Sequence, residues 1–270
     1  TPVFGFTKNS KEFFEDKTSE KLENPVIFHQ QEILNLFDKE SQFAAAYPNF
    51  EFRPAQAQML AQICQAFADD KFLIIEAATG TGKSLAYLIP SIFWSLAHNE
   101  KVVVSTQTIN LQEQLSLKDI PLLQKVLDFP FKAAVIKGRK NYLCLAKWQN
   151  KLQNPEDLSI KEKYFLARIT TWLQETQVGD KEELNISLSE EGLWSQVCAD
   201  SYTCLGKLCP WLDNCFVFQA RKNADQAHIV ITNHSLLLTD AKHENKILPK
   251  HSYLIIDEAH NLEQEATNQL

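Results

Sequence analysis

A glycine-containing loop that ends in Lys83-Ser84 has the residue types that bind a phosphate chain. Glycines let backbone N–H groups turn toward phosphates, and the N-terminus of a following helix favours negative charge. Lys83 would reach the β and γ phosphates, and Ser84 would bind Mg²⁺. The Lys-Ser pair disfavours the plain alternative, a glycine turn with only a structural role. The loop, Ala77-Ala78-Thr79-Gly80-Thr81-Gly82-Lys83-Ser84, therefore predicts a site for ATP and Mg²⁺ at Thr79, Gly80, Thr81, Gly82, Lys83 and Ser84.

Asp257 and Glu258 supply the acidic groups that such a site needs. They follow the apolar string Leu254-Ile255-Ile256. If that string is a strand, both carboxylates lie at its carboxyl end, where ligands bind in open α/β sheets. Asp257 is then placed to hold Mg²⁺, and Glu258 to orient and deprotonate the attacking water. An acidic pair alone also suits the solvated start of a helix. Its combination with the phosphate loop favours a nucleoside triphosphatase with Lys83, Asp257 and Glu258 as catalytic residues.

Strands that alternate with helices must position these groups. Apolar residues recur at helical spacing over 55–67 and 85–96 and around 111–115. This alternation predicts an α/β fold, a parallel sheet with helices on both faces. Residues 1–49 are interpreted as a linker or N-terminal extension with one short helix around Glu32 to Ala46. Short apolar runs predict buried strands at 72–75, 102–104, 133–136, 229–231 and 254–256.

The alternation stops after Gly138, and a long segment intervenes before it resumes. Residues 139–222 are expected to form a small, mostly helical insert, with one helix near Tyr164 to Leu173. The insert would divide a single α/β lobe into a first part at 50–138 and a second part at 223–270. This division explains why Ser84 and Asp257 are further apart in the sequence than one lobe requires.

The cysteines of the insert are spaced irregularly. Cys204, Cys209 and Cys215 are separated by four and five residues, while Cys144 and Cys198 lie further upstream. Wide, irregular gaps suit a [4Fe-4S] cluster, because the chain must wrap around a bulky cube with one thiolate for each iron. The paired two-residue gaps of structural zinc sites are absent from the sequence, although a site with four cysteines and zinc stays open as an alternative.

The Asp-Glu-Ala-His string at 257–260, the phosphate loop that starts with Ala77, and the cysteine-bearing insert together resemble the DinG/XPD iron–sulfur DNA helicases of superfamily 2. The resemblance covers about residue 50 to the C-terminus. It implies a RecA-like helicase lobe and an ATP-dependent DNA helicase that translocates on single-stranded DNA and unwinds duplexes and DNA junctions. By the same resemblance Gln56, in Arg53-Pro54-Ala55-Gln56, reads the adenine base, and His260 couples the nucleotide site to the DNA-facing motifs. The strings at 105–108 and 232–237 resemble the family's DNA-backbone motif and its re-entry into the lobe.

The resemblance also implies the ligands of the cluster. In the family one cysteine follows a Gly-Arg-x-Asn-Tyr string, which stands here before Cys144, and three more share the spacing of Cys204, Cys209 and Cys215. These four are therefore the expected [4Fe-4S] ligands. Cys198 and Cys64 are interpreted as small buried hydrophobes.

Aromatic and cationic residues near the cysteines have the types that bind single-stranded DNA by stacking and phosphate contacts. We expect the cations to have this role and most of the aromatic residues to fill a small core. The residues are Arg139, Tyr142, Trp148, Trp211, Phe216, Arg221 and Lys222.

The composition sets further limits. A net charge of -7 argues against binding nucleic acid through bulk positive charge, but it allows a local basic groove. No apolar run is long enough to span a bilayer, and no secretion signal precedes the fold, so a cytoplasmic monomer without a membrane partner is expected. The resemblance implies that the arch domain and second lobe lie outside this chain, which alone would then be inactive. A nucleotide-binding iron–sulfur sensor without unwinding activity is the alternative function.

Overall fold

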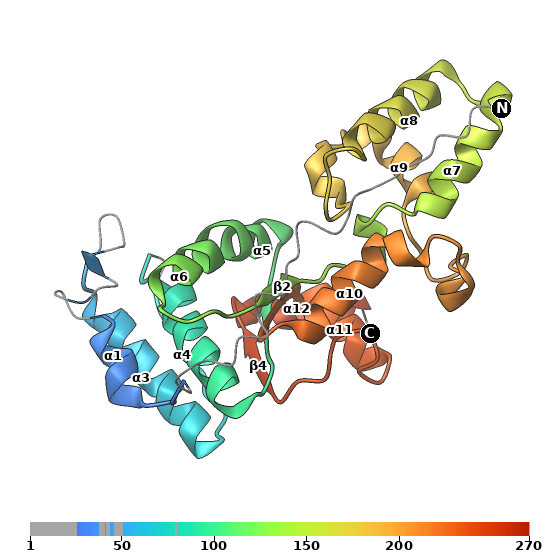
Figure 1. The fold of residues 1–270 in the computed structure, drawn as a ribbon. Helices are drawn as coiled ribbons and strands as arrows, with labels where there is room; N and C mark the ends of the chain where they lie inside the picture. The colour runs from blue at the N-terminus through green and yellow to red at the C-terminus, as the bar shows by residue number, and fades with distance from the viewer. Residues whose placement is uncertain (1–25, 38–40, 42–43, 46–50, 79, 270) are drawn as a thin grey trace.

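The computed structural model describes residues 26–37, 41, 44–45, 51–78 and 80–269, and a four-stranded parallel sheet lies at its centre (Figure 1). The strands lie in the order β2-β3-β1-β4, which confirms the α/β class. Consecutive strands are joined through helices, as parallel pairing requires. The strands are β1 (Val102–Thr106), β2 (Ala133–Val135), β3 (Ile229–Asn233) and β4 (Tyr253–Ile256).

Alternate residues of these strands enter two separate cores, because successive side chains of a strand point to opposite faces. Val102 and Val104 pack under α3 (Pro54–Asp69), α4 (Lys83–His98) and α6 (Ile120–Val126). Val103 packs on the other face, with residues of α10 (Phe216–Gln226) and α11 (His234–Lys242). Helices therefore cover both faces of the sheet, as the sequence predicts.

The register of the sheet brings three chain segments to one edge. Thr106 of β1 pairs with Asn233 of β3, and Ser105 pairs with Ile256 of β4. The carbonyl of Ser105 also accepts a hydrogen bond from the backbone N–H of Asp257 at 2.8 Å. The segments that follow β1, β3 and β4 thus begin side by side at the carboxyl edge, where α/β sheets bind ligands.

The strand expected at 72–75 is wrong for this structure. The segment is extended chain outside the sheet, and Phe72 and Ile74 are fully exposed. A strand forms only when a neighbour completes its hydrogen-bond ladder, and no described residue pairs with this segment. Ile75 alone of the four residues packs against the core, so the apolar character of 72–74 is not matched by burial here.

The helix expected around Glu32 to Ala46 is shorter and begins earlier. It is α1 (Gln30–Asn35), and residues 38–40, 42–43 and 46 of the expected span lie outside the described residues. Ile33 and Phe37 are buried in the core beneath α3 and α4. This part of the stretch interpreted as a linker therefore packs against the lobe.

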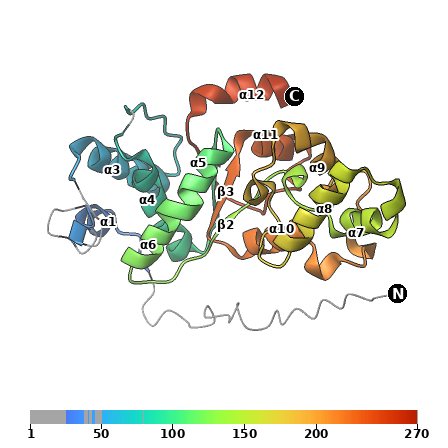
Figure 2. The ribbon, with the colours of Figure 1, turned by 90° about the horizontal axis from the view of Figure 1, so that it is seen from above.

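The insert forms a second, mostly helical body next to the sheet, and Figure 2 shows it on the side away from α3 and α4. Its helices are α7 (Leu145–Gln153), α8 (Ile160–Trp172) and α9 (Glu191–Val197). They enclose their own core, which includes Trp148, Ile169 and Trp194. Short 3-10 turns join them at Arg139–Asn141, Pro155–Asp157, Lys181–Leu184, Leu188–Glu190, Gly206–Leu208 and Leu212–Asn214.

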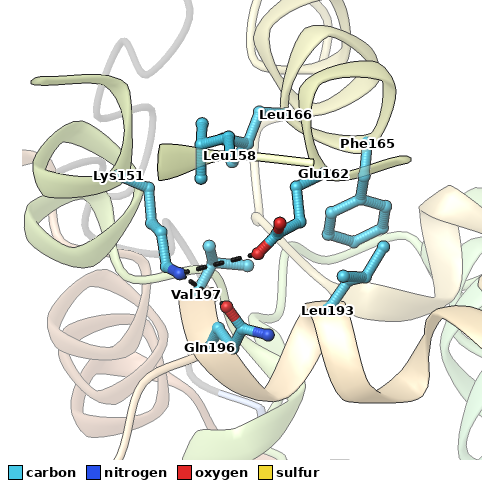
Figure 3. A pocket seen from close by; sticks show the side chains of 8 residues that line it. All are labelled: Lys151, Leu158, Glu162, Phe165, Leu166, Leu193, Gln196 and Val197. Carbon is cyan, nitrogen blue, oxygen red and sulfur yellow. Dashed lines mark hydrogen bonds and ion pairs between the residues drawn. The ribbon is translucent and has the colours of Figure 1, made fainter. Parts of the chain in front are cut away.

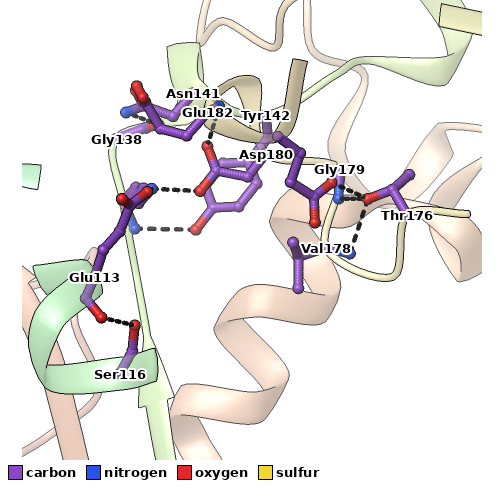
Figure 4. A network of polar contacts seen from close by, with 12 residues as sticks. Glu113, Ser116, Gly138, Asn141, Tyr142, Thr176, Val178, Gly179, Asp180 and Glu182 are labelled. Atoms are coloured by element: carbon purple, nitrogen blue, oxygen red, sulfur yellow. Dashed lines mark hydrogen bonds and ion pairs between the residues drawn. The ribbon is translucent and has the colours of Figure 1, made fainter. Parts of the chain in front are cut away.

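A network of polar contacts joins the insert to the lobe, and Figure 4 shows Glu113 on one side of it and Tyr142 and Asp180 on the other. Lys137, just after β2, has a side chain only 5% exposed and contacts Asp180 of the insert at 2.5 Å. Glu113 of α5 (Ile109–Gln114) lies 3.7 Å from the same ammonium group. The backbone N–H of Lys137 also donates to the hydroxyl of the buried Tyr142 at 3.0 Å. Charge and hydrogen bonding therefore fix the insert at one point of the lobe.

A small hollow between α7, α8 and α9 is too small to be a ligand site (Figure 3). Its cavity volume is about 10 Å³, roughly the space of one water molecule. Lys151 closes one side by donating to Gln196 Oε1 at 2.6 Å and lies 3.9 Å from Glu162. No described helix is both long and apolar enough to cross a bilayer.

Candidate nucleotide and metal site

The phosphate loop has the backbone conformation that its glycines allow. Gly80 and Gly82 have φ values of 79° and 84°, in the left-handed region that other residues rarely adopt. α4 begins at Lys83, so its free N–H groups lie at the end of the loop. Thr81 closes a turn by donating its hydroxyl to the Ala78 carbonyl at 2.6 Å. Thr79, the other expected binding threonine, lies outside the described residues.

Gln56 lies directly against this loop. Its side chain is buried and donates from Nε2 to the Gly82 carbonyl at 2.8 Å. A side chain at position 82 would overlap the Gln56 amide, which gives Gly82 a second reason to be glycine. Arg53 donates to the Gly80 carbonyl from the same helix start. α3 therefore braces the loop from the side, while the adenine contact of Gln56 stays a prediction.

Lys83 and Glu258 form an ion pair across the site. Lys83 Nζ donates to Glu258 Oε1 at 2.8 Å, and the side chains are 26% and 29% exposed. The hydrogen bond from Lys83 holds the pKa of Glu258 below its usual value. Glu258 has a positive φ of 55°, a strained conformation for this residue type that is common at functional sites. A phosphate chain that recruits Lys83 must therefore replace Glu258 as its partner.

Asp257 is held by a tyrosine of α4. The Tyr87 hydroxyl donates to Asp257 Oδ2 at 3.0 Å, and Tyr87 is 2% exposed. Burial, followed by the negative charge of Asp257, raises the pKa of Tyr87 well above its usual value, so the phenol stays a donor. Ser84 lies one helical turn earlier, close to the same phenol. The two expected Mg²⁺ ligands, Ser84 and Asp257, are thus brought together by Tyr87.

Two further buried groups support the carboxyl edge. Asp119 is 7% exposed, and burial raises its pKa, while the charge of Lys118 and then the side chains of Ser84 and Gln114 act in the opposite direction. His234 Nδ1 lies 2.7 Å from the Ser105 hydroxyl, and burial lowers the pKa of the imidazole. Neutral His234 therefore lies directly behind the strand ends that carry the acidic pair.

The structure brings only part of the cysteine set together. Cys144 and Cys215 interact electrostatically, and they stand just before α7 and α10. Cys204 is exposed and Cys209 half-buried, and no group of three or more His, Cys, Asp or Glu residues in the described chain is arranged to hold a metal ion. All six cysteines are free thiols. Cys198 and Cys64 are buried, which confirms their assignment to the core, and burial raises the pKa of Cys64 to about 12.

The aromatic residues and cations of the insert separate as expected. Tyr142, Trp148 and Phe216 are buried in the insert core, and Trp211 is half-buried. Lys222 is exposed, and Arg139 and Arg221 are half-buried. Burial and then the nearby charge of Arg139 lower the pKa of Arg221, so the two guanidinium groups lie near each other. Two neighbouring cations would suit a phosphate group, although Asp225 and Asp240 also act on Arg221.

Comparison with known proteins places this arrangement in a family. The family model described as "Type III restriction enzyme, res subunit" matches residues 49–270, which include the phosphate loop and the Asp257-Glu258 pair. The chain belongs to this family. It is also 39% identical over 234 residues to the ATP-dependent helicase DinG of Mycobacterium tuberculosis, covering 80% of this chain and 35% of that protein.

Other relatives support the same assignment. The ATP-dependent DNA helicase YoaA of Escherichia coli is 36% identical over 84% of this chain and 36% of its own length. The 3'-5' exonuclease DinG of Bacillus subtilis is 36% identical over 83% of this chain and 24% of its own length. The chain thus spans about a third or less of these relatives, and the expected resemblance to DinG-type helicases is confirmed.

Sequence reasoning missed two residues of the site, Tyr87 and Asp119. Tyr87 follows Ser84 by three positions, so a helix starting at Lys83 puts both on one face. That spacing was a usable signal. No signal in the sequence pointed to Asp119, because this residue joins the site only through the packing of the segment after β1 against α4.

Proposed function

We propose that this chain is the first motor lobe of an ATP-dependent DNA helicase that moves on single-stranded DNA and unwinds duplexes and junctions. The observation that carries the proposal is the pairing of Lys83 with Glu258 beside Asp257, at the carboxyl edge of a parallel sheet. A phosphate-binding lysine, a metal-binding carboxylate and a general base are what triphosphate hydrolysis requires. The helicase names of relatives at 36–39% identity support the DNA substrate.

Each side chain has a defined task in this proposal. Lys83 exchanges Glu258 for the β and γ phosphates, and the backbone N–H groups at the start of α4 cradle the phosphate chain. Glu258, released by that exchange, orients and deprotonates a water molecule. Ser84 and Asp257 would hold Mg²⁺, which supplies positive charge to the phosphates when bound. Gln56 would contact the adenine base while its amide braces the loop.

The decisive test is steady-state ATP hydrolysis by the intact protein with and without single-stranded DNA. We expect stimulation by DNA, loss of hydrolysis in Glu258→Gln, and little change in Glu263→Gln, which removes the same charge from an exposed site one helix further on. ATP binding that persists without any DNA-stimulated hydrolysis would contradict the helicase and favour the nucleotide-binding sensor.

We also propose that Cys144, Cys204, Cys209 and Cys215 bind a [4Fe-4S] cluster, which would make the insert a rigid platform. The donor chemistry fits, since all four are free thiols and Cys144 and Cys215 already lie near each other. Cluster binding would have to draw Cys204 and Cys209 toward this pair. Anaerobically purified protein should contain about four iron and four sulfide per chain. Cys204→Ser should lose them while Cys198→Ser keeps them, and stoichiometric zinc without iron would contradict the assignment.

The cations of the insert are the proposed contact with the DNA backbone. Arg221→Ala or Lys222→Ala should weaken binding of single-stranded DNA and reduce the slope of log affinity against log salt by about 0.7 for each lost phosphate contact. Lys163→Ala, on the exposed face of α8, is the matched control. An unchanged slope in both variants would contradict contact between these cations and the DNA backbone.

We also propose that the protein works as a cytoplasmic monomer.

A further inference from the structure

Asp119 is a buried acid that the proposed mechanism does not use. It is 7% exposed and ends the π-helical turn η2 (Leu115–Asp119), between α5 and α6. Its Oδ2 has no hydrogen-bond partner among the described residues. A carboxylate removed from water costs free energy unless it is paired, so such a group calls for an explanation.

Capping of helix α6 does not explain why the carboxyl group of Asp119 is buried. The residue stands at the N-cap position of α6, yet its side chain accepts no hydrogen bond from the first turn of that helix. A π-helical turn contains one residue more than an α-helical turn, so it rotates the residues at its end, including Asp119, relative to a regular helix. Such turns are frequent at functional sites.

One neighbour of Asp119, Ser84, stands at the end of the phosphate loop. Lys118, Ser84 and Gln114 lie close enough to the Asp119 carboxyl group to affect its ionisation. Ser84 also lies close to Tyr87, whose hydroxyl donates to Asp257 Oδ2 at 3.0 Å. Asp119 is close enough to Tyr87 to affect it electrostatically. The Ser84 hydroxyl therefore lies between Asp119 and the tyrosine that holds Asp257.

We propose that Asp119 is a positioning residue of the metal site, which accepts a hydrogen bond from the Ser84 hydroxyl and so directs the lone pairs of the Ser84 oxygen toward Mg²⁺. A serine hydroxyl has one proton and two lone pairs, so fixing the proton fixes where the lone pairs point. Tyr87 has the matching role for Asp257, because it occupies one carboxylate oxygen of that residue. The inference rests on the proposed binding of ATP with Mg²⁺, and it adds Asp119 to the two acids, Asp257 and Glu258, already assigned to that site.

The test is the Mg²⁺ dependence of ADP binding to the intact protein, measured by calorimetry. Asp119→Asn keeps the size of the side chain and removes its charge. We expect the Mg²⁺ concentration for half-maximal tightening to rise about five- to tenfold, as for loss of one hydrogen bond to a charged acceptor, while ADP affinity in EDTA is unchanged. Asp128→Asn, an exposed acid of the same lobe, should match the wild type.

A double variant shows whether Asp119 acts through Ser84. Ser84→Ala should itself raise the Mg²⁺ requirement, and adding Asp119→Asn to it should change nothing further. Should Asp119→Asn not fold, Asp119→Ser removes the charge with less volume and the same rise is expected. A wild-type Mg²⁺ dependence in a folded Asp119 variant, or an equal effect with and without Ser84, would overturn the inference. ADP binding that Lys83→Ala leaves unchanged would instead overturn the proposed nucleotide site.

Discussion

Glu258→Gln should tighten ADP binding, because it releases Lys83. The two side chains lie 2.8 Å apart, yet each is more than a quarter exposed. Exposed ion pairs contribute about 0.2–1 kcal/mol and hydrogen bonds to charged groups about 1.5–3 kcal/mol. Discounted for solvent screening, the pair is worth about 1 kcal/mol. Since about 1.4 kcal/mol corresponds to a factor of ten, we expect ADP to bind roughly three- to fivefold more tightly.

The assay is titration calorimetry with ADP and Mg²⁺, which avoids the hydrolysis step that the same substitution blocks. Glu263→Gln is the matched control and should bind as the wild type does. The lowered pKa of Glu258 also predicts how ADP binding depends on pH. Because Lys83 lowers the pKa of Glu258, the pair persists above the ordinary glutamate pKa and is lost as the pH falls through the lowered value. The wild type should therefore approach the variant in acid. Equal or weaker binding by Glu258→Gln, with Lys83→Ala still impaired, would refute the exchange of partners.

Three further perturbations test how the insert is held. The Lys147 ammonium, followed by the hydroxyl and backbone N–H of Thr203 and the backbone N–H of Tyr202, donates to Asp200 and holds its pKa below the usual range. Asp200→Asn should speed proteolysis of this loop just before Cys204, and the wild-type loop should loosen only in acid, as the pH falls through the lowered pKa. Lys137→Met leaves Asp180 buried without its cation and should lower the free energy of unfolding by about 3 kcal/mol in urea titrations. Gly179→Ala would overlap the Phe216 ring and force a shift, so a loss of about 1–3 kcal/mol in the same assay is expected.

Much of the fold followed from local pattern. Val102, Val103 and Val104 enter the two cores alternately, as the two-residue repeat of a strand requires, and α4 follows from its apolar face. The phosphate loop was equally readable, because glycine freedom and a helix N-terminus act within a few residues. Residue types at 77–84 and 257–258 therefore determined the chemistry of the site before any packing was known.

Pairing between distant segments was decided by the tertiary structure. Lys83 and Glu258 are 175 positions apart, and Tyr87 reaches Asp257 only because α4 packs on the sheet beside β4. Asp119 joins them from a third segment. The run at 72–75 has strand sequence but no hydrogen-bonded neighbour in the described part of the chain, so its apolar character alone led to a wrong prediction. Residue type sets what a side chain can do, whereas the partner that completes a hydrogen bond or an ion pair is supplied by the packing of the whole chain.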